Sequence, residues 1–194
     1  MACGSCSVEN ALKVACIHYV QKQRNGKAPT NQELESSMIN QAPGSANLSI
    51  LSFKHAFHGR TFGALSCTHS KPIHKLDIPA FDWPIASYPI YQYPLAEHEK
   101  ANRKIDDECL AEVEDLIEKY NKKGKHVAGL LVEPIQGEGG DNRASDYFYQ
   151  QLRKITTKHN VTFICDEVQT GCGPTGKFWA HQYWGNDASP DIVT

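Results

Sequence analysis

The sequence predicts an α/β fold in which a mostly parallel sheet is flanked by helices. Short apolar runs, typical of strands buried on both faces, alternate along the chain with longer amphipathic segments that are typical of helices. Two of the apolar runs, at 127–132 and 161–165, end directly at an acidic residue. Alternation at this spacing favours βαβ units, and ligands of such sheets bind at the carboxyl ends of the strands. We therefore expect a binding site where these two strands end.

The first expected element is a helix from residue 8 to about residue 23, where apolar residues form a broad face. Ser5 or Ser7 can cap its N-terminus, and Glu9 lies in its first turn. A loop-rich insertion follows at 24–47, because this segment is polar and contains Gly and Pro, with one short helix at 31–39.

The rest of the chain alternates strands with helices around one irregular segment. A strand at 48–53 leads into a turn at 56–60 and a short helix towards Cys67. Residues 70–97 contain five prolines and many aromatic residues, and are expected to form an ordered meander. The remaining elements are, in order, a helix at 106–123, a strand at 127–132, a helix at 145–159, a strand at 161–165 and a strand at 190–194.

Composition excludes several classes of protein. The chain has 194 residues, enough for one domain, with 40% hydrophobic residues, 22% charged residues and a net charge of −2. It has no basic excess that would suggest nucleic acid, and no apolar run approaches the about 18 residues of a membrane span. Seven cysteines without a disulfide-framework spacing favour free thiols in a reducing compartment. No signal or transit peptide follows Met1, and both ends are expected to be internal boundaries.

Acidic residues at the strand ends are the strongest candidates for chemistry. Asp166 follows a buried strand and is poorly solvated there, so it needs a cationic partner, although a helix cap or a structural ion pair is the alternative. Glu133 ends the neighbouring strand, and Glu138 follows in a Gly-rich loop where a solvated surface charge is the alternative. Two carboxylates at neighbouring strand ends favour a site over two unrelated surface charges.

Three short segments complete the candidate site. Gly4 and Ser5 open the first helix, where free N–H groups attract anions, although an ordinary cap is the commoner explanation. Phe57 and Arg60 place an aromatic ring beside a guanidinium that suits carboxylates, the alternative being a core Phe and a surface Arg. His58 between them is expected to support the residues that touch the ligand. Among the cysteines, Cys3 and Cys6 have the spacing of metal ligands, a redox dithiol or two idle thiols being the alternatives.

The run FICDEVQTG from Phe163 to Gly171 is followed by Gly176 and by a second β-prone run, Asp191 to Thr194. This arrangement resembles the class III (ω-amino acid) aminotransferases, whose signature continues to the lysine that holds pyridoxal phosphate. The resemblance implies a transferase of fold-type I. It also implies that residues 1–194 are part of the large cofactor-binding domain, with an N-terminal segment, the lysine region and a C-terminal small domain outside them.

The resemblance also implies roles for the cofactor-binding candidates. Asp166 is expected to pair with the protonated ring nitrogen of pyridoxal phosphate, which makes the ring an electron sink. Val168 is expected to pack on one face of the ring, and Gln169 to hydrogen-bond its phenolic oxygen. Gly4 and Ser5 are expected to bind the cofactor phosphate at the start of the first helix.

For the substrate pocket, the resemblance implies an aromatic ring, an arginine and two carboxylates. Phe57 is expected over the cofactor ring, and Arg60 at the substrate carboxylate. Glu133 and Glu138 are expected among the catalytic residues that line the pocket. Glu138 resembles a gate that masks a second arginine beyond Thr194 for one substrate and releases it for the other.

Several segments are similar to the branch of the family, in animals and fungi, that transfers the amino group of 4-aminobutyrate to 2-oxoglutarate. These are the Cys3/Cys6 pair, the segments between Thr68 and Ala86, and Gly176–His181. The branch implies a homodimer in the mitochondrial matrix and a 2Fe–2S cluster that Cys3 and Cys6 of two subunits ligate together. The alternatives are an ornithine or β-alanine aminotransferase and, from a different class, a non-catalytic dithiol or metal-binding module.

Overall fold

A five-stranded sheet forms the centre of the structure, a computed structural model that describes residues 2–194. The strand order is β2-β1-β3-β4-β5, and every neighbouring pair is parallel. The strands are β1 (Leu48–Phe53), β2 (Ile85–Ala86), β3 (His126–Val132), β4 (Thr162–Cys165) and β5 (Ile192–Val193). Apolar residues occupy β3 and β4 almost continuously because both faces of these strands are covered. The predicted α/β class with a parallel sheet is confirmed.

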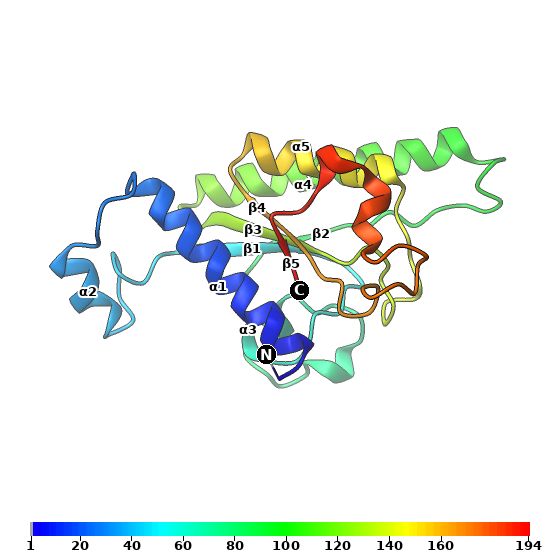
Figure 1. Cartoon of the computed structure of the whole chain (residues 1–194). Coiled ribbons are helices and arrows are strands. Elements are labelled where there is room, and N and C mark those ends of the chain that lie inside the picture. The colour runs from blue at the N-terminus through cyan, green and yellow to red at the C-terminus, as the bar shows by residue number, and fades with distance from the viewer. Residues whose placement is uncertain (1) are drawn as a thin grey trace.

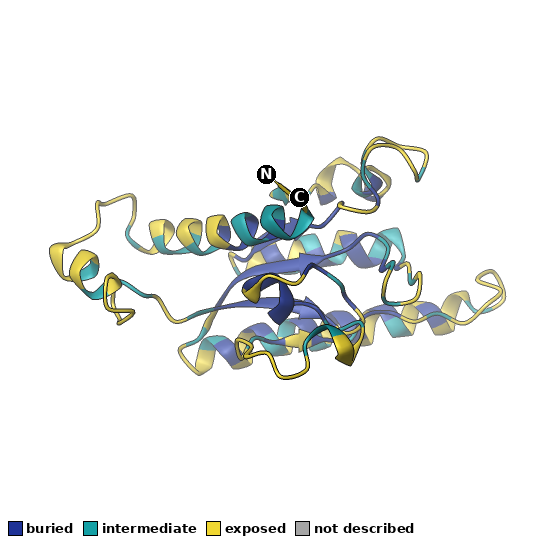
Figure 2. Ribbon diagram, turned by 90° about the horizontal axis from the view of Figure 1, so that it is seen from below, coloured by how far each residue is buried: buried dark blue, intermediate teal, exposed yellow. Residues whose placement is uncertain are grey.

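Helices cover both faces of the sheet, with α4 and α5 above it and α1 and α3 below it in the view of Figure 1. The helices are α1 (Gly4–Gln23), α2 (Asn31–Ser37), α3 (Phe62–Ser66), α4 (Glu99–Lys122) and α5 (Asp146–Lys158). Short 3-10 helices span Pro72–His74, Ala180–Trp184 and Asn186–Ala188. The strands lie buried between the two helical layers (Figure 2). None of the helices in the described chain is long and apolar enough to cross a membrane.

The core consists of two apolar clusters, one on each face of the sheet. The larger cluster joins one sheet face to α4 and α5 through residues such as Phe53, Val113 and Phe148. The smaller cluster packs Val8 and Leu12 of α1 against the other face. Because both clusters use the same strands, the sheet is fixed from both sides and its carboxyl edge is held in place.

Two helices begin earlier than the sequence predicts. α4 starts at Glu99 instead of residue 106, because its first turns are held by buried polar residues and not by an apolar stripe. Asn102 exchanges hydrogen bonds with the backbone of Gln92, and Asp106 accepts hydrogen bonds from Tyr91 and Ser145. Such contacts with distant residues leave no periodic signal in the sequence.

α1 starts at Gly4, and its predicted caps are wrong. The capping position is Cys3, whose side chain makes no capping hydrogen bond, while Ser5 and Ser7 lie within the helix. The carboxylate of Glu9 turns away from its own helix and accepts hydrogen bonds from the N-terminus of α3. The N-terminus of α1 thus has no side-chain cap and no carboxylate in its first turn, which suits it to an anion.

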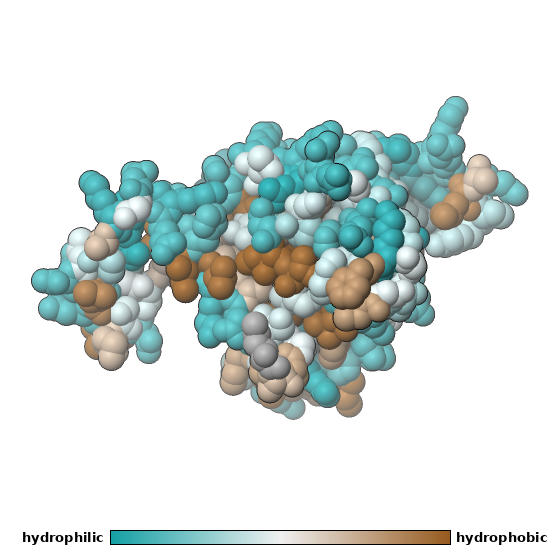
Figure 3. Space-filling model, viewed as in Figure 1, coloured by the Kyte–Doolittle hydropathy of each residue, from teal (hydrophilic) through white to brown (hydrophobic). Residues whose placement is uncertain are grey.

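The insertion at 24–47 projects from the body beside the C-terminal end of α1 (Figure 1). Its helix α2 buries no residue and is stabilised locally by a capping box between Thr30 and Glu33. Apolar side chains gather in a band over α1 in the space-filling view (Figure 3), and Val14 and Ile17 of this helix are more than half exposed.

Candidate functional site

A cavity of about 510 Å³ lies at the carboxyl ends of β3 and β4. The prediction that Glu133 and Asp166 end neighbouring strands is confirmed, since β3 pairs with β4 in parallel. The cavity brings together every candidate site residue except Cys6. Its lining residues are Cys3, Gly4, Ser5, Phe57, His58, Gly59, Arg60, Glu133, Ile135, Glu138, Asp166, Val168, Gln169 and Thr170.

A slightly larger hollow, of about 590 Å³, lies between α1 and the segment around Trp83. It contains Arg24 and Lys125, but each of these cations already pairs with a carboxylate. The hollow lies away from the strand ends that carry Glu133 and Asp166. The volume of a cavity therefore does not identify the functional site. The chemistry of the residues that line the cavity identifies it.

Asp166 lies on the floor of the cavity, with 5% of its surface exposed. Its Oδ2 lies 2.8 Å from Nδ1 of His58, and its Oδ1 accepts a hydrogen bond from the backbone N–H of Val168. The Nε2 atom of His58 is buried and has no hydrogen-bond partner among the described residues. His58 is thus the polar partner that burial of Asp166 requires, in the supporting position that the sequence suggested.

Glu133 is almost as buried as Asp166 and holds the turn that carries the aromatic residue. Its Oε1 accepts a hydrogen bond of 2.8 Å from the backbone N–H of Phe57. Burial raises the pKa of Glu133 to about 7, and the nearby His58 and the Phe57 N–H oppose that rise. Glu133 is therefore able to hold or release a proton near neutral pH.

The start of α1 forms one wall of the cavity. A Cβ added to Gly4 would lie 2.7 Å from Cγ1 of Val168, so the first residue of the helix must be small there. The Oγ of Ser5 accepts a hydrogen bond of 3.1 Å from the backbone N–H of Arg60. Gly59 has φ +115°, and a Cβ at that position would lie 2.0 Å from the same Oγ. Only glycine permits this approach of the turn to the helix.

The mouth of the cavity carries charges of both signs. Glu138 pairs with Lys71 at 2.7 Å, both side chains being about half exposed, and this hydrogen bond lowers the pKa of Glu138. Arg60 is exposed nearby and adds to that lowering. The ring of Phe57 packs edge-on against the ring of His74, with 5.1 Å between the ring centroids. The sequence did not indicate Lys71 or His74, because both lie in the irregular meander and reach the site only through tertiary contacts.

Glu167 fixes the loop that carries Val168 and Gln169. Its carboxylate accepts hydrogen bonds from Thr170 Oγ1, from the backbone N–H of Ala180, and from both the backbone N–H and Nδ1 of His181. Cys165, Glu167 and His181 form a group with metal-ligand geometry. Since Glu167 already accepts these four hydrogen bonds and a fifth from the Cys165 thiol, we assign the group a structural role. The two consecutive acidic residues therefore have different roles: Asp166 lines the cavity, and Glu167 stabilises the loop.

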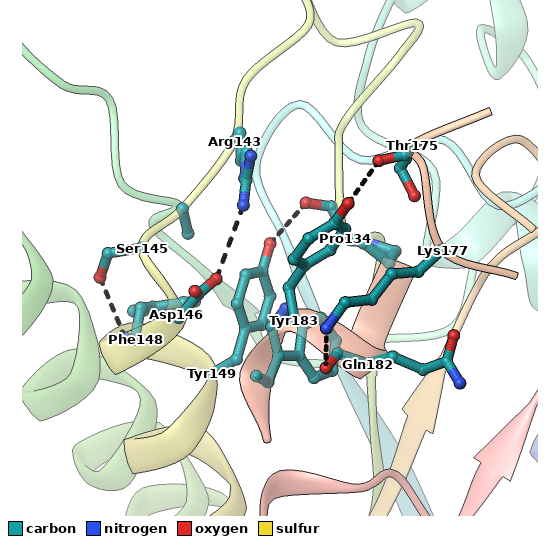
Figure 4. A network of polar contacts seen from close by, with 12 residues as sticks. Pro134, Arg143, Ser145, Asp146, Phe148, Tyr149, Thr175, Lys177, Gln182 and Tyr183 are labelled. Atoms are coloured by element: carbon teal, nitrogen blue, oxygen red, sulfur yellow. Dashed lines mark hydrogen bonds and ion pairs between the residues drawn. The ribbon is translucent and has the colours of Figure 1, made fainter. Parts of the chain in front are cut away.

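A polar network contacts the segment that follows Glu133 (Figure 4). Tyr149 donates a hydrogen bond of 2.8 Å to the carbonyl of Pro134, and its ring stacks on Trp184 at 4.0 Å. Tyr183 donates to the carbonyl of Thr175 at 2.6 Å. Tyr149 of α5 thus contacts both the segment after β3 and the 3-10 helix that carries Trp184, while Tyr183 of that 3-10 helix binds the preceding loop.

All seven cysteines are free, as predicted. The Sγ atoms of Cys3 and Cys6 lie 3.4 Å apart at the start of α1, and hydrogen bonds with Cys6 lower the pKa of the Cys3 thiol. No third metal-ligating side chain lies within reach of this pair in the described part of the chain. The pair offers two of the four thiolates that an iron–sulfur cluster takes.

Comparison with known proteins gives one consistent result. The aminotransferase class-III family matches residues 1–194. The chain is 60% identical over 194 residues to mitochondrial 4-aminobutyrate aminotransferase of Sus scrofa, covering all of this chain and 39% of that protein. It is 62% identical over 192 residues to the 4-aminobutyrate aminotransferase of Dictyostelium discoideum, covering 99% of this chain and 38% of that protein. The chain thus spans about two-fifths of the length of these relatives.

Solved structures support the same assignment. A lysine aminotransferase from M. tuberculosis superposes with a TM-score of 0.77 at 33% identity, covering 98% of this chain and 39% of that chain. An amine transaminase from an uncultivated Pseudomonas species, solved in a form with bound pyridoxal phosphate (PLP), gives a TM-score of 0.71 at 25% identity. That match covers all of this chain and 38% of that chain.

Proposed function

Because the chain belongs to the class III aminotransferase family, we propose that the protein transfers the amino group of 4-aminobutyrate to 2-oxoglutarate. The products are succinate semialdehyde and glutamate. Relatives bearing the name 4-aminobutyrate aminotransferase match the whole chain at 60% and 62% identity, which supports this choice of substrate within the family. The observation that carries the proposal is the single cavity that joins Asp166, the N-terminus of α1 and Arg60.

The residues of this cavity fit pyridoxal phosphate. The N-terminus of α1, which has no side-chain cap, and the Ser5 hydroxyl both line the cavity and suit a phosphate group, while Gly4 leaves room for Val168 beside them. The buried carboxylate of Asp166 suits a protonated ring nitrogen. Val168 would pack on the ring, and Gln169 would donate to its phenolic oxygen. When bound, this cofactor supplies an electron sink for the substrate carbon that loses a proton.

The chain's own residues orient the charges around that chemistry. Asp166 keeps its negative charge directed into the cavity, because His58 and the Val168 N–H hold its two oxygens from behind. Glu133 fixes the backbone of Phe57, so the aromatic ring stays at the cavity wall. Arg60 would bind the substrate carboxylate through its planar fork. These groups bind and orient, and burial raises the pKa of Glu133 to about 7.

Glu138 would act as the gate between the two substrates. 4-Aminobutyrate carries no carboxylate beside its amino group, whereas 2-oxoglutarate carries one beside its keto group. A carboxylate that covers a second arginine for the first substrate, and leaves it for the second, serves both. Lys71, which pairs with Glu138 at 2.7 Å, gives that carboxylate an alternative cation at the mouth of the cavity.

Further features follow from family membership as parts of the same proposal. Residues 1–194 would form part of the large cofactor-binding domain, with the lysine that holds the cofactor supplied from outside this range, since none lines the cavity. The protein would be a homodimer in the mitochondrial matrix, like relatives whose names include that organelle. Cys3 and Cys6 of two subunits would ligate one 2Fe–2S cluster.

The test uses the protein at the full length of its relatives. Addition of 4-aminobutyrate should change the visible absorbance of the bound cofactor, and 2-oxoglutarate should restore it. Ornithine and β-alanine, added in parallel at the same concentrations, should give slower changes. A fast response to ornithine with none to 4-aminobutyrate would assign the protein to another branch of the family. No cofactor absorbance after loading would contradict the aminotransferase proposal itself.

A further inference from the structure

Helix α1 holds the turn that carries Arg60 at two consecutive residues. The Ser5 hydroxyl accepts a hydrogen bond of 3.1 Å from the backbone N–H of Arg60. One helical turn later, Oε1 of Glu9 accepts a hydrogen bond of 2.6 Å from the hydroxyl of Thr61. The same oxygen accepts from the N–H groups of Gly63 and Ala64, at 2.7 and 3.0 Å.

Glu9 replaces the cap that α3 lacks. Thr61 occupies the N-cap position of α3, but its side chain makes no capping hydrogen bond, because the N–H groups of Gly63 and Ala64 donate to Glu9 instead. A carboxylate from a different helix therefore satisfies the free N–H groups of this five-residue helix. As a result, the segment from Arg60 to Ala64 cannot shift without breaking contacts to α1.

Arg60 itself is exposed, and a long, solvated side chain is poorly fixed by its own packing. Its orientation therefore depends on where its backbone is held. Ser5 binds the backbone N–H of Arg60, and Glu9 binds the side chain of Thr61. The backbone is therefore anchored to α1 on both sides of the Arg60 Cα. The start of that helix is also the proposed phosphate site.

We propose that Glu9, together with Ser5, is a positioning residue that fixes Arg60 in front of the cavity so that its guanidinium meets the substrate carboxylate. The inference rests on the proposed function through the role of Arg60. It implies that α1 is a common base for two subsites, one for the cofactor phosphate and one for the substrate carboxylate. A shift of this turn by about 1 Å would weaken carboxylate recognition, because bidentate binding depends on alignment.

The test measures dissociation constants by calorimetry on the full-length, cofactor-loaded enzyme. Two probes are compared: butyrate, which has the carboxylate but no amine, and butylamine, which has the amine but no carboxylate. Glu9→Ala should weaken butyrate binding about tenfold and leave butylamine binding unchanged. Glu9→Gln should retain butyrate binding within about twofold, because its amide oxygen accepts the same three hydrogen bonds. Lys22→Ala, exposed near the other end of α1, is the control.

The Thr61→Val variant provides a second test, which remains informative if the Glu9→Ala variant fails to fold. It removes one donor to Glu9 while the carboxylate still caps α3, and should weaken butyrate binding about threefold. Equal weakening of both probes by Glu9→Ala, or no change in butyrate binding by either variant, would overturn the inference. The proposed role of Arg60 fails in a different way: Arg60→Ala would then leave butyrate binding at the wild-type value.

Discussion

Nδ1 of His58 lies 2.8 Å from Oδ2 of Asp166, and the two side chains are 0% and 5% exposed. The residues are 108 positions apart in the sequence. The contact links the turn that carries Phe57 and Arg60 to the end of β4. It follows that the orientation of the Asp166 carboxylate depends on the same turn that presents the proposed substrate-binding arginine. The proposed cofactor-binding residue Asp166 and the proposed substrate-binding residue Arg60 are therefore structurally coupled through His58.

Asp166→Asn should lower kcat of the full-length enzyme on the order of 10²-fold or more, about 3 kcal/mol of barrier. The amide would remove the negative charge that is proposed to keep the ring nitrogen protonated, while the proposed phosphate site at α1 would be untouched. Steady-state kinetics with 4-aminobutyrate, together with a cofactor titration, measure both effects. A wild-type kcat with only a raised KM would show that Asp166 is a binding residue.

Arg60→Lys should raise the KM for 4-aminobutyrate while the cofactor absorbance stays as in the wild type. Lysine keeps the positive charge but lacks the planar fork, so the substrate carboxylate is held without alignment. The backbone N–H that donates to Ser5 remains in this variant. Loss of cofactor with an unchanged KM would instead assign Arg60 to the cofactor site or to the fold.

Glu133 should make the stability of the protein depend on pH. Burial raises its pKa to about 7, against an unfolded value of about 4.3. Since the folded state binds the proton more tightly, the stabilisation is complete below the unfolded pKa and is lost as the pH rises through 7. The amount is about 4 kcal/mol. Between about pH 5 and about pH 8, the free energy of unfolding should fall less in Glu133→Gln than in the wild type, as denaturant titrations would measure. Parallel curves for the two proteins would contradict this.

Gly59→Ala should destabilise the protein by about 2–3 kcal/mol and weaken both cofactor and substrate binding. The added Cβ would lie 2.0 Å from Ser5 Oγ, which forces the Arg60 turn away from α1. Gly173→Ala is the matched control, since Gly173 has a similar positive φ, +102°, but open space around its Cβ. Unfolding curves of the two variants separate backbone strain from the contact with Ser5. Equal losses would mean that the contact is unimportant.

If Cys3 and Cys6 ligate the proposed cluster, replacing both by serine should remove iron and labile sulfide from the purified full-length protein. A hydroxyl is a poor ligand for iron–sulfur clusters, and this pair is the one with ligand spacing in the sequence. Metal analysis of wild type and double variant gives the answer. Equal iron in both proteins would exclude the cluster. Transaminase activity should survive in the double variant, because the proposed phosphate site consists of backbone N–H groups and Ser5.

The sequence predicted the sheet and the acidic floor of the site well, because both depend on local patterns. Apolar runs located β3 and β4 to within about one residue, and the acidic residues directly after them had to meet at one edge. By contrast, the partner of Asp166 and the new role of Glu9 depend on contacts between distant segments. A histidine or a glutamate in such a contact looks, in the sequence, like any polar residue in a turn or a first helical turn.

Errors arose where polar residues replace the usual local signal. The serines near the start of α1 suggested caps, yet the helix begins at Gly4 and leaves its first turn without a side-chain cap. The first turns of α4 were missed since Asn102 and Asp106 are buried through hydrogen bonds. β2 has only two residues and pairs with β1 from within the proline-rich meander, so it carries no strand pattern of its own.

The strand register also has a kinetic consequence for how the cavity is assembled during folding. Gly129 of β3 pairs with Thr162 of β4, whereas Ile50 of β1 must find Gly129 across a loop more than twice as long. Closing the longer loop carries an additional entropic cost of about 0.8 kcal/mol. The β3–β4 pair, with Glu133 and Asp166 at its ends, is therefore expected to form first. Until β1 docks, Asp166 lacks its contact with His58, and Glu133 lacks the hydrogen bond from the Phe57 N–H. The two carboxylates are therefore expected to come together before the groups that stabilise them are in place.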